Sequence, residues 1–485
     1  MNQKISHSIS RIVPLLTLVA FLLFLIFPTT AVASTLVEVN PVNTPDGAVI
    51  LIIDGLGSPY IYPELTPYAI DGTALSKAVV YNISQIAENS ARIVDIRAPQ
   101  TYTEAGHSVL VTGNSGADGE MVGYSGATIY DVAHDNGYLA LAVLQRGDFY
   151  NMRAEQDIIL YDETNSINNP MIKMATFEHS SGNVPQDVVE IMEMRAEGAN
   201  NYVNRFPESS GERYDAYNMW ALDTASDIIR SMSESAPEQK YILTINAGAI
   251  DSSGHYRRNG GYIENIEGLD AAIMPLYELC IENNLAFILT ADHGMAFAAD
   301  DVRGGHQAEK YAVTSEAQMI PFIVHAPNVE EVLIDGEFGQ EDIAPTILSI
   351  LNIPNELRFT DGSDIGLKDY VNMKVNAPDS NGVELVRDGV TIAFASNDDN
   401  DEYLFVGLES GVNYTVRVSG ALGARSGIME QEVLADTDMI IEFTAQSMTS
   451  ENGGLFQNMR HLIGGVLIVL INGIGMVVIV RILKE

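Results

Sequence analysis

Acidic, imidazole and hydroxyl side chains occur in four short segments whose spacing suits metal chemistry. The chain has nine histidines, and three of them fall in two of these segments. Within two segments, the paired residues lie four positions apart, which lets them face one ion. The segments are Asp54, Thr103 to His107, Asp251 to His255, and Asp292-His293 followed by His306.

These residue types point to divalent metal ions. Mixed carboxylate and imidazole ligands suit Zn²⁺, and also manganese or iron. Three aspartates, three histidines and a threonine are enough for two ions that act on one substrate. Each segment alone also has a structural reading, because an Asp often ends a strand in a turn and a Thr often caps a helix.

A sheet must bring these segments together. Short apolar runs bounded by polar turns indicate strands buried on both faces, and amphipathic stretches between them, such as 127–136 and 269–283, indicate helices. This alternation predicts an α/β fold with helices on both faces of the sheet. Reactive groups then lie at the carboxyl ends of the strands. The predicted strands are 47–53, 91–96, 139–144, 241–245, 286–290 and 320–325.

The remaining segments divide the chain into further parts. Residues 34–372 form the expected catalytic domain, within which 34–46 serve as a leader and the polar, helical stretch 180–235 as a cap over the site. Short strands separated by Asp, Asn and Gly turns predict a small β-sandwich over 373–447. A polar tether over 448–460 follows.

Both ends of the chain predict a membrane-anchored protein that works outside the cytoplasm. Residues 1–33 have the basic start, apolar run and Ala-x-Ala site of a signal peptide, with an uncleaved anchor as the alternative. Residues 461–482 form an apolar stretch long enough to cross a bilayer. Arg481 and Lys484 at its end favour a cytoplasmic tail.

The charge of the chain limits the kinds of ligand it can bind, and its cysteine content limits the disulfides it can form. The net charge is −39, with 26 basic against 65 acidic residues, which argues against nucleic-acid binding. An anionic substrate therefore needs local positive charge, which bound cations could supply. The single cysteine, Cys280, excludes an intramolecular disulfide, and its apolar surroundings favour a buried structural role.

The order of the motifs resembles the alkaline phosphatase superfamily. The resemblance covers about residues 47–365 and is greatest to the nucleotide pyrophosphatase/phosphodiesterase and phosphonoacetate hydrolase branch. It rests on the strand ending in Asp54-Gly, the Thr103-to-Gly113 segment, Asp251-x-x-Gly-His255, Asp292-His-Gly-Met, Gly-His306 and the 342–348 helix.

The resemblance implies a role for each residue. Asp54, Asp292 and His293 would hold one ion, and Asp251, His255 and His306 the other. Thr103 would be the nucleophile that touches both ions, with Ser108 as the rival and Thr101 and Thr112 as further alternatives. Asn114 would bind the substrate, although the sequence around it departs from the family pattern. No sulfatase-type Cys/Ser-x-Pro-x-Arg motif is present.

The implied activity is hydrolysis of a phosphoester through a phospho-threonine intermediate, with two divalent ions, Zn²⁺ first, activating the Thr103 hydroxyl. The substrate would be a small phosphorylated compound. Arg146, Arg257, Arg258 and Arg303 lie near the motifs and could hold it, or could be surface residues. Two alternatives stay open: a phosphotransferase or mutase of the same superfamily, and a non-enzymatic surface protein that binds through the β-module. Substrate class, metal identity and oligomeric state are also open.

Overall fold

The computed structural model describes residues 34–179, 182–378, 380–396, 401–422 and 425–443. The expected signal peptide, the expected tether and the expected transmembrane helix all lie outside these residues. Within the described ranges, no helix is both long and apolar enough to span a bilayer.

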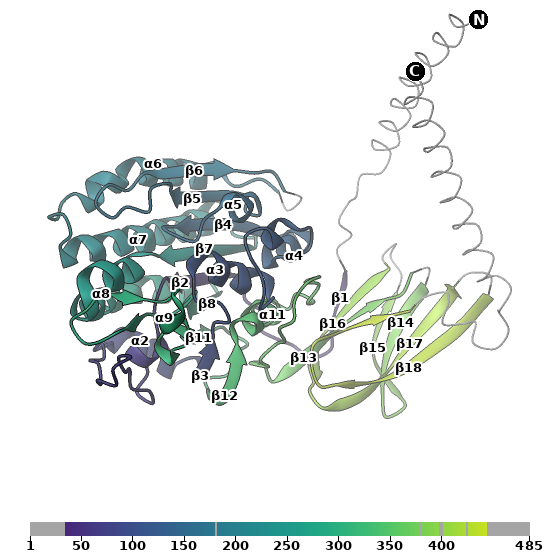
Figure 1. Cartoon of the computed structure of the whole chain (residues 1–485). Helices are drawn as coiled ribbons and strands as arrows, with labels where there is room; N and C mark the ends of the chain where they lie inside the picture. The colour runs from purple at the N-terminus through teal and green to yellow at the C-terminus, as the bar shows by residue number, and fades with distance from the viewer. Residues whose placement is uncertain (1–33, 180–181, 379, 397–400, 423–424, 444–485) are drawn as a thin grey trace, which may run out of the picture.

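The described chain folds into a large α/β body and a smaller β-module beside it (Figure 1). The body is built on a nine-stranded sheet in which β11 and β6 run antiparallel to the rest. In sheet order the strands are β12 (Leu333–Gly339), β3 (Ala91–Arg97), β11 (Met319–His325), β8 (Leu285–Thr290), β2 (Gly47–Ile53), β7 (Tyr241–Ala247), β4 (Leu139–Leu144), β5 (Ile158–Asp162) and β6 (Ile172–Thr176).

The sheet interior explains the apolar runs. Every residue of β2, β4, β7 and β8 is buried, as expected for parallel strands covered on both faces. All six strands predicted from the sequence are present. The strands of the large sheet that were not predicted are β5, β6 and β12, and they lie at its two sides. Partly buried and exposed side chains follow one another along β6 and β12.

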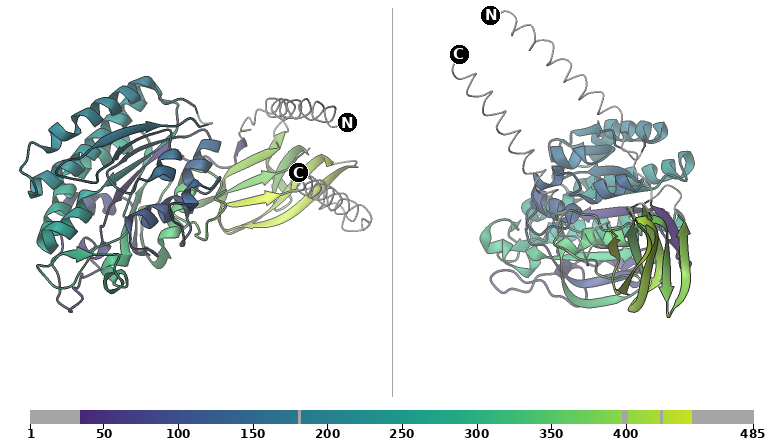
Figure 2. Two further views of the ribbon diagram at one scale, coloured as in Figure 1. Left: turned by 45° about the horizontal axis from the view of Figure 1, so that its top comes forward. Right: turned by 90° about the vertical axis from the view of Figure 1, so that its right-hand side faces the viewer.

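Two groups of helices enclose the sheet (Figure 2). One group packs in succession and consists of α2 (Tyr81–Glu88), α8 (Ala249–Glu282), α7 (Gly211–Ser235) and α6 (Gln186–Val203). The other consists of α3 (Thr103–Thr112), α4 (Ile129–Asp135) and α11 (Ile343–Ile350). Shorter elements are α5 (Tyr150–Ala154), α9 (Glu309–Ala312), α10 (Ser315–Gln318), η1 (Ser58–Tyr60), η2 (Met121–Gly123), η3 (Gln340–Asp342), β9 (Ala296–Phe297) and β10 (Gly304–Gly305).

In the described part of the stretch 180–235, α6 and α7 are helical as predicted, and α7 packs on the sheet instead of forming a separate cap. Trp220, Ile228 and Ile229 of α7 are buried in the main core of the body. The apolar stripe of α7 therefore covers the sheet, while only the start of this helix approaches the site described below.

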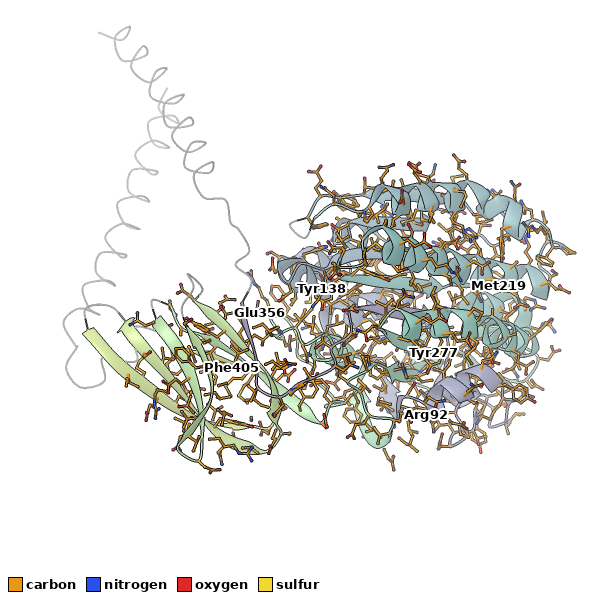
Figure 3. All side chains as sticks on the ribbon, turned by 180° about the vertical axis from the view of Figure 1, so that it is seen from behind. Arg92, Tyr138, Met219, Tyr277, Glu356 and Phe405 are labelled. Carbon is orange, nitrogen blue, oxygen red and sulfur yellow. The ribbon has the colours of Figure 1, made fainter. Side chains whose placement is uncertain are left out.

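The β-module is a sandwich of two four-stranded sheets around its own core, in which Phe405 is fully buried (Figure 3). One sheet has the order β1 (Thr35–Glu38), β16 (Glu402–Glu409), β13 (Tyr370–Asn376) and β19 (Met439–Glu442). The other has β15 (Val390–Ser396), β14 (Ser380–Arg387), β17 (Val412–Leu422) and β18 (Arg425–Ala435).

One strand of the module comes from the other end of the chain. Residues 34–46 were expected to lead into the catalytic domain, but β1 pairs in parallel with β16, so that Thr35 lies opposite Tyr403. The module therefore combines residues 35–38 with residues 370–443.

Candidate metal centre and active site

The predicted site residues meet at the carboxyl edge of the large sheet. Strands β8, β2 and β7 are neighbours, and each is followed by one of the aspartates: Asp292, Asp54 and Asp251 respectively. Thr103 begins α3 after β3, and His306 follows the short β9–β10 hairpin. The order of the strands thus brings together residues more than 200 positions apart in the chain.

Asp54, Asp292 and His293 form the first cluster. His293 Nε2 lies 3.3 Å from Asp292 Oδ2 and 3.8 Å from Asp54 Oδ1. All three side chains are fully buried. Their ligand atoms are close enough to share one ion.

Asp251, His255 and His306 form the second cluster. Asp251 Oδ1 lies 3.2 Å from His255 Nε2 and 3.3 Å from His306 Nε2, and the two histidine Nε2 atoms are 3.0 Å apart. The rings of His306 and His293 stack with centroids 3.8 Å apart, so the two clusters adjoin.

Backbone carbonyls orient all three histidines. The Nδ1 atoms of His293, His306 and His255 face the carbonyls of Gly294, Thr101 and Gly304 at 3.0, 2.6 and 3.2 Å. A carbonyl can only accept, so each Nδ1 carries the proton and each Nε2 keeps its lone pair for the cluster. This is the outer-shell arrangement that metal-binding histidines use.

The carboxylates have buried oxygens that the protein leaves without a partner. Among the described residues, no donor reaches either oxygen of Asp54 or Asp292 Oδ2, and Asp251 Oδ1 has only the imidazole Nε2 atoms beside it. Burying such atoms unpaired is costly. Divalent cations would satisfy them, so the residues fit the metals implied by their types.

The electrostatics of the cluster are those of crowded carboxylates. Burial, with Asp292 and Asp251 nearby, raises the pKa of Asp54, and burial raises the pKa of Asp292 to about 7. Burial acts in the same direction on Asp251, but the adjacent imidazoles of His255 and His306 and the charge of Arg146 hold the pKa of Asp251 well below its usual range. Burial lowers the pKa of His293, which favours the neutral, ligating form.

Thr103 is the hydroxyl that faces the clusters. Its Oγ1 lies 3.3 Å from His293 Nε2. The other candidates each donate to a backbone carbonyl at 2.7 Å: Thr101 to His306, Ser108 to Glu104 and Thr112 to Ser108. These three hydroxyls have a structural role that Thr103 does not share.

Asn114 lies away from the clusters. It follows the far end of the ten-residue helix α3 from Thr103, about 15 Å along its axis. Its Nδ2 donates to the carbonyl of Phe359 at 2.5 Å, and its Oδ1 accepts from Gly116 N at 3.0 Å. The geometry therefore gives no support to a substrate-binding role for Asn114.

Three further residues support the site. His107 Nε2 lies 4.0 Å from Asp292 Oδ2 and 3.3 Å from Asn246 Nδ2, and burial lowers the pKa of His107 to about 3. Arg146 donates to Asp251 Oδ2 at 2.8 Å and to Ser252 Oγ at 2.6 Å. Asn246 was not identified from the sequence, where its signal was an amide within the apolar run of β7.

An open pocket of about 530 Å³ adjoins the second cluster. Ser252 and Tyr256, which are neighbours of Asp251 and His255 in the chain, lie in its wall. Three arginines, Arg146, Arg257 and Arg303, also line it, and its described lining includes no Asp or Glu. Arg146 pairs with Asp251 at 2.8 Å and Arg257 with Glu264 at 2.7 Å, so carboxylates partly offset the charge of this arginine-rich wall.

Comparison with known proteins gives a family match and partial relatives. The family model described as Metalloenzyme superfamily matches residues 47–355. The 2,3-bisphosphoglycerate-independent phosphoglycerate mutase of Anaplasma phagocytophilum is 28% identical over 138 residues, which cover 28% of this chain and 27% of that protein. The corresponding mutase of Nostoc punctiforme is 31% identical over 144 residues, covering 28% and 26%. The chain thus spans about a quarter of the length of these relatives.

Solved structures with a similar fold include a phosphatase and a phosphonate hydrolase. Alkaline phosphatase PafA aligns with a TM-score of 0.48 and 13% identity, covering 68% of this chain and 100% of that chain. Phosphonate monoester hydrolase SpPMH from Silicibacter pomeroyi aligns with a TM-score of 0.40 and 11% identity, covering 87% and 95%.

Proposed function

Because the chain belongs to the Metalloenzyme superfamily, we propose that it is a metal-dependent phosphoester hydrolase with Thr103 as nucleophile. The family expected from the motifs is confirmed at the level of the Metalloenzyme superfamily, whose model matches residues 47–355. The nucleotide pyrophosphatase/phosphodiesterase-like branch stays a prediction. So do the extracytoplasmic location and the membrane anchor.

The observation that carries this proposal is the meeting of Thr103 with the two clusters of buried, unpartnered ligands. Asp54, Asp292 and His293 would hold one ion, and Asp251, His255 and His306 the other. The ions, with Zn²⁺ first and manganese or iron as alternatives, would lower the pKa of the Thr103 hydroxyl and offset the charge of the phosphoryl group.

The residues of the chain then perform a double displacement. Thr103 Oγ1 forms a bond to phosphorus while the bond from phosphorus to the leaving alcohol breaks. Water next attacks the phospho-threonine, which releases phosphate and restores Thr103. Arg146 keeps Asp251 charged and in place through its 2.8 Å contact. The position of Thr103 at the start of α3 also favours negative charge on the transferred group.

The arginine-lined pocket supports an anionic, small phosphorylated substrate. Arg257 and Arg303 lie in the same wall as Arg146, so they could contact a charged group of the substrate beyond the scissile phosphate. The pocket does not distinguish a monoester from a diester, and the choice is left to the assay.

The test measures nitrophenol release from p-nitrophenyl phosphate and bis-p-nitrophenyl phosphate by the purified full chain, with its metal content measured in the same samples. We expect chelator-sensitive release that Thr103→Ala abolishes and Thr103→Ser retains in part. Ser108→Ala is the matched control, and we expect it to stay active. Full activity of Thr103→Ala would rule out this nucleophile.

A phosphotransferase is the second candidate, and the similarity to phosphoglycerate mutases over part of the body favours it. The same assay separates the two. With p-nitrophenyl phosphate a hydrolase releases inorganic phosphate in step with nitrophenol, and with the diester it releases p-nitrophenyl phosphate, whereas a transferase needs an added hydroxyl acceptor and forms its phosphorylated product instead.

A further inference from the structure

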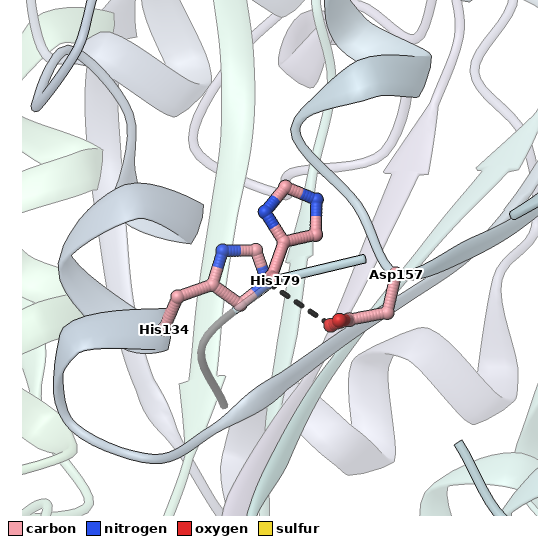
Figure 4. Close-up of side chains that lie close together, drawn as sticks. All are labelled: His134, Asp157 and His179. Carbon is pink, nitrogen blue, oxygen red and sulfur yellow. Dashed lines mark hydrogen bonds and ion pairs between the residues drawn. The ribbon is translucent and has the colours of Figure 1, made fainter. Parts of the chain in front are cut away.

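A further group of potential metal ligands lies away from the active site, near the amino ends of the parallel strands of the large sheet. His134 is in the last turn of α4, Asp157 immediately precedes β5, and His179 follows β6 (Figure 4). Asp157 stands at the amino end of a parallel strand, whereas Asp54, Asp251 and Asp292 follow the carboxyl ends of theirs. Asp157 therefore lies at the opposite end of the strands from these three residues. We infer that His134, Asp157 and His179 bind a third transition-metal ion, Zn²⁺ by their donor types, at a site separate from the active site.

The geometry of these three side chains suits one ion. Their ligand atoms all lie within 4.8 Å of one another. His134 Nε2 is 3.0 Å from Asp157 Oδ2, and the rings of His134 and His179 stack with centroids 4.1 Å apart. Two imidazoles and a carboxylate are ligands that zinc commonly takes, and they leave a coordination position for water.

Hydrogen bonding within the protein accounts for only part of the cluster. Asp157 Oδ2 lies 3.0 Å from His134 Nε2 and accepts from the backbone N–H of Ala140 at 2.7 Å. Its second oxygen, Oδ1, has no partner among the described residues, although Asp157 is only 2% exposed. His179 Nε2 is also buried without a partner. A cation would satisfy both atoms. A bound ion would link α4, the start of β5 and the segment after β6, which lie at the outer side of the sheet.

The test separates this site from the catalytic one. In the full chain carrying Asp54→Asn, Asp251→Asn and Asp292→Asn together with His255→Gln, His293→Gln and His306→Gln, the catalytic ligands are removed, and Zn²⁺ alone is titrated by calorimetry. We expect one equivalent to bind and to raise the unfolding temperature. Adding His179→Gln, a substitution at a half-buried residue, should abolish both effects, whereas His325→Gln, the matched control, should leave them unchanged.

Two results would overturn the inference: no Zn²⁺ binding by the variant without the catalytic ligands, or unchanged binding after His179→Gln. If His179→Gln does not fold, Co²⁺ titration of the variant without the catalytic ligands still decides, because tetrahedral imidazole and carboxylate ligation gives a visible absorption band and its absence excludes the site. In the otherwise native chain, His179→Gln should lose one metal equivalent and keep its hydrolase activity. If the inference of a third metal ion fails, the catalytic proposal is unaffected, because it rests on other residues.

Discussion

Single residues around the metal centre leave little room for change, as Gly147 shows. A Cβ atom at Gly147 would lie 2.3 to 2.4 Å from three atoms of the His107 ring. His107 in turn fills the space beside Asp292 and Asn246. The His107 ring can therefore occupy this place only because position 147 has no side chain.

We expect Gly147→Ala to displace His107 and to lower both the metal content and the stability of the protein. Overpacking of this kind costs about 1–3 kcal/mol. Gly137→Ala is the matched control, because Gly137 has a similar φ of 79° but nothing within 4 Å of its Cβ position. Thermal unfolding of both variants isolates the clash from the cost of a left-handed backbone. Equal losses in the two would contradict this role.

The carboxyl group of Asp215 on α7 makes the stability of the folded protein depend on pH. Burial raises the pKa of Asp215 to about 6, although Asn265 Nδ2 donates to its Oδ1 at 2.6 Å. The folded protein thus keeps this proton to higher pH than the unfolded chain, where the pKa is about 3.9. Its stabilising contribution is complete below about pH 4 and is lost as the pH rises through 6.

Asp215→Asn should therefore be more stable than the parent at pH 7–8, by about 1–3 kcal/mol. The advantage should shrink below pH 6 and vanish near pH 4. Unfolding curves across this range measure it, with the exposed Asp436→Asn as control. A constant difference at all pH values would show that the carboxyl does not titrate as described.

Among the elements, α8 is two helices joined at Arg258. Arg258 has φ 63° and ψ −174°, a backbone region that is essentially restricted to glycine. The break lets residues 249–257 present Asp251 and His255 to the metal centre, while the part after Arg258 follows a different direction and packs against α2 and α7.

Arg258→Gly should stabilise the protein, because relief of about 1–3 kcal/mol of strain exceeds the about 0.5–1 kcal/mol entropy cost of a glycine. The ion pair that it removes, Arg258 with Asp301 at 3.0 Å, joins two exposed side chains and contributes little. Arg258→Ala keeps the strain and loses the same ion pair, so it should not gain stability. Chemical unfolding of the two variants compares them directly.

Elements differed in how far the sequence predicted them, and burial explains much of the difference, although the short buried strand β5 was also missed. The apolar runs of β2, β4, β7 and β8 were found because both faces are covered. The site followed, since its residues stand directly after such runs. The sequence did not predict β6 and β12, because exposed and partly buried residues are mixed along these strands. It also did not predict the pairing of β1, because the partner strand β16 lies far along the chain.

At the scale of the molecule, polar contacts join the body to the β-module. Lys374 of β13 has a side chain that is 7% exposed and lies between Glu356, 2.5 Å away on the body side, and Glu402 of β16 at 2.8 Å. Glu356 lies at the junction of the two parts (Figure 3). Nearby, Lys368 pairs with Asp438 at 3.0 Å, and Asn372 donates to Asn352 at 2.8 Å.

Lys374→Met should loosen this junction, because it leaves two carboxylates facing each other without their shared cation. The glutamates are 37% and 38% exposed, so water limits the loss to about 1–3 kcal/mol. Calorimetry should show the module unfolding at a lower temperature than the body. Restoring neutrality with Glu356→Gln and Glu402→Gln in the same chain should recover most of the loss, and a lack of recovery would contradict the charge argument.

The pairing of β1 with β16 sets an order of events during synthesis. Thr35 leaves the ribosome before its partner Tyr403 has been made. At about 5–20 residues per second, that interval is roughly 20–70 s. The large sheet, whose strands all lie between residues 47 and 339, can close within it. During that time residues 35–38 have no strand to pair with, so the first described segment of the chain is among the last to reach its native place.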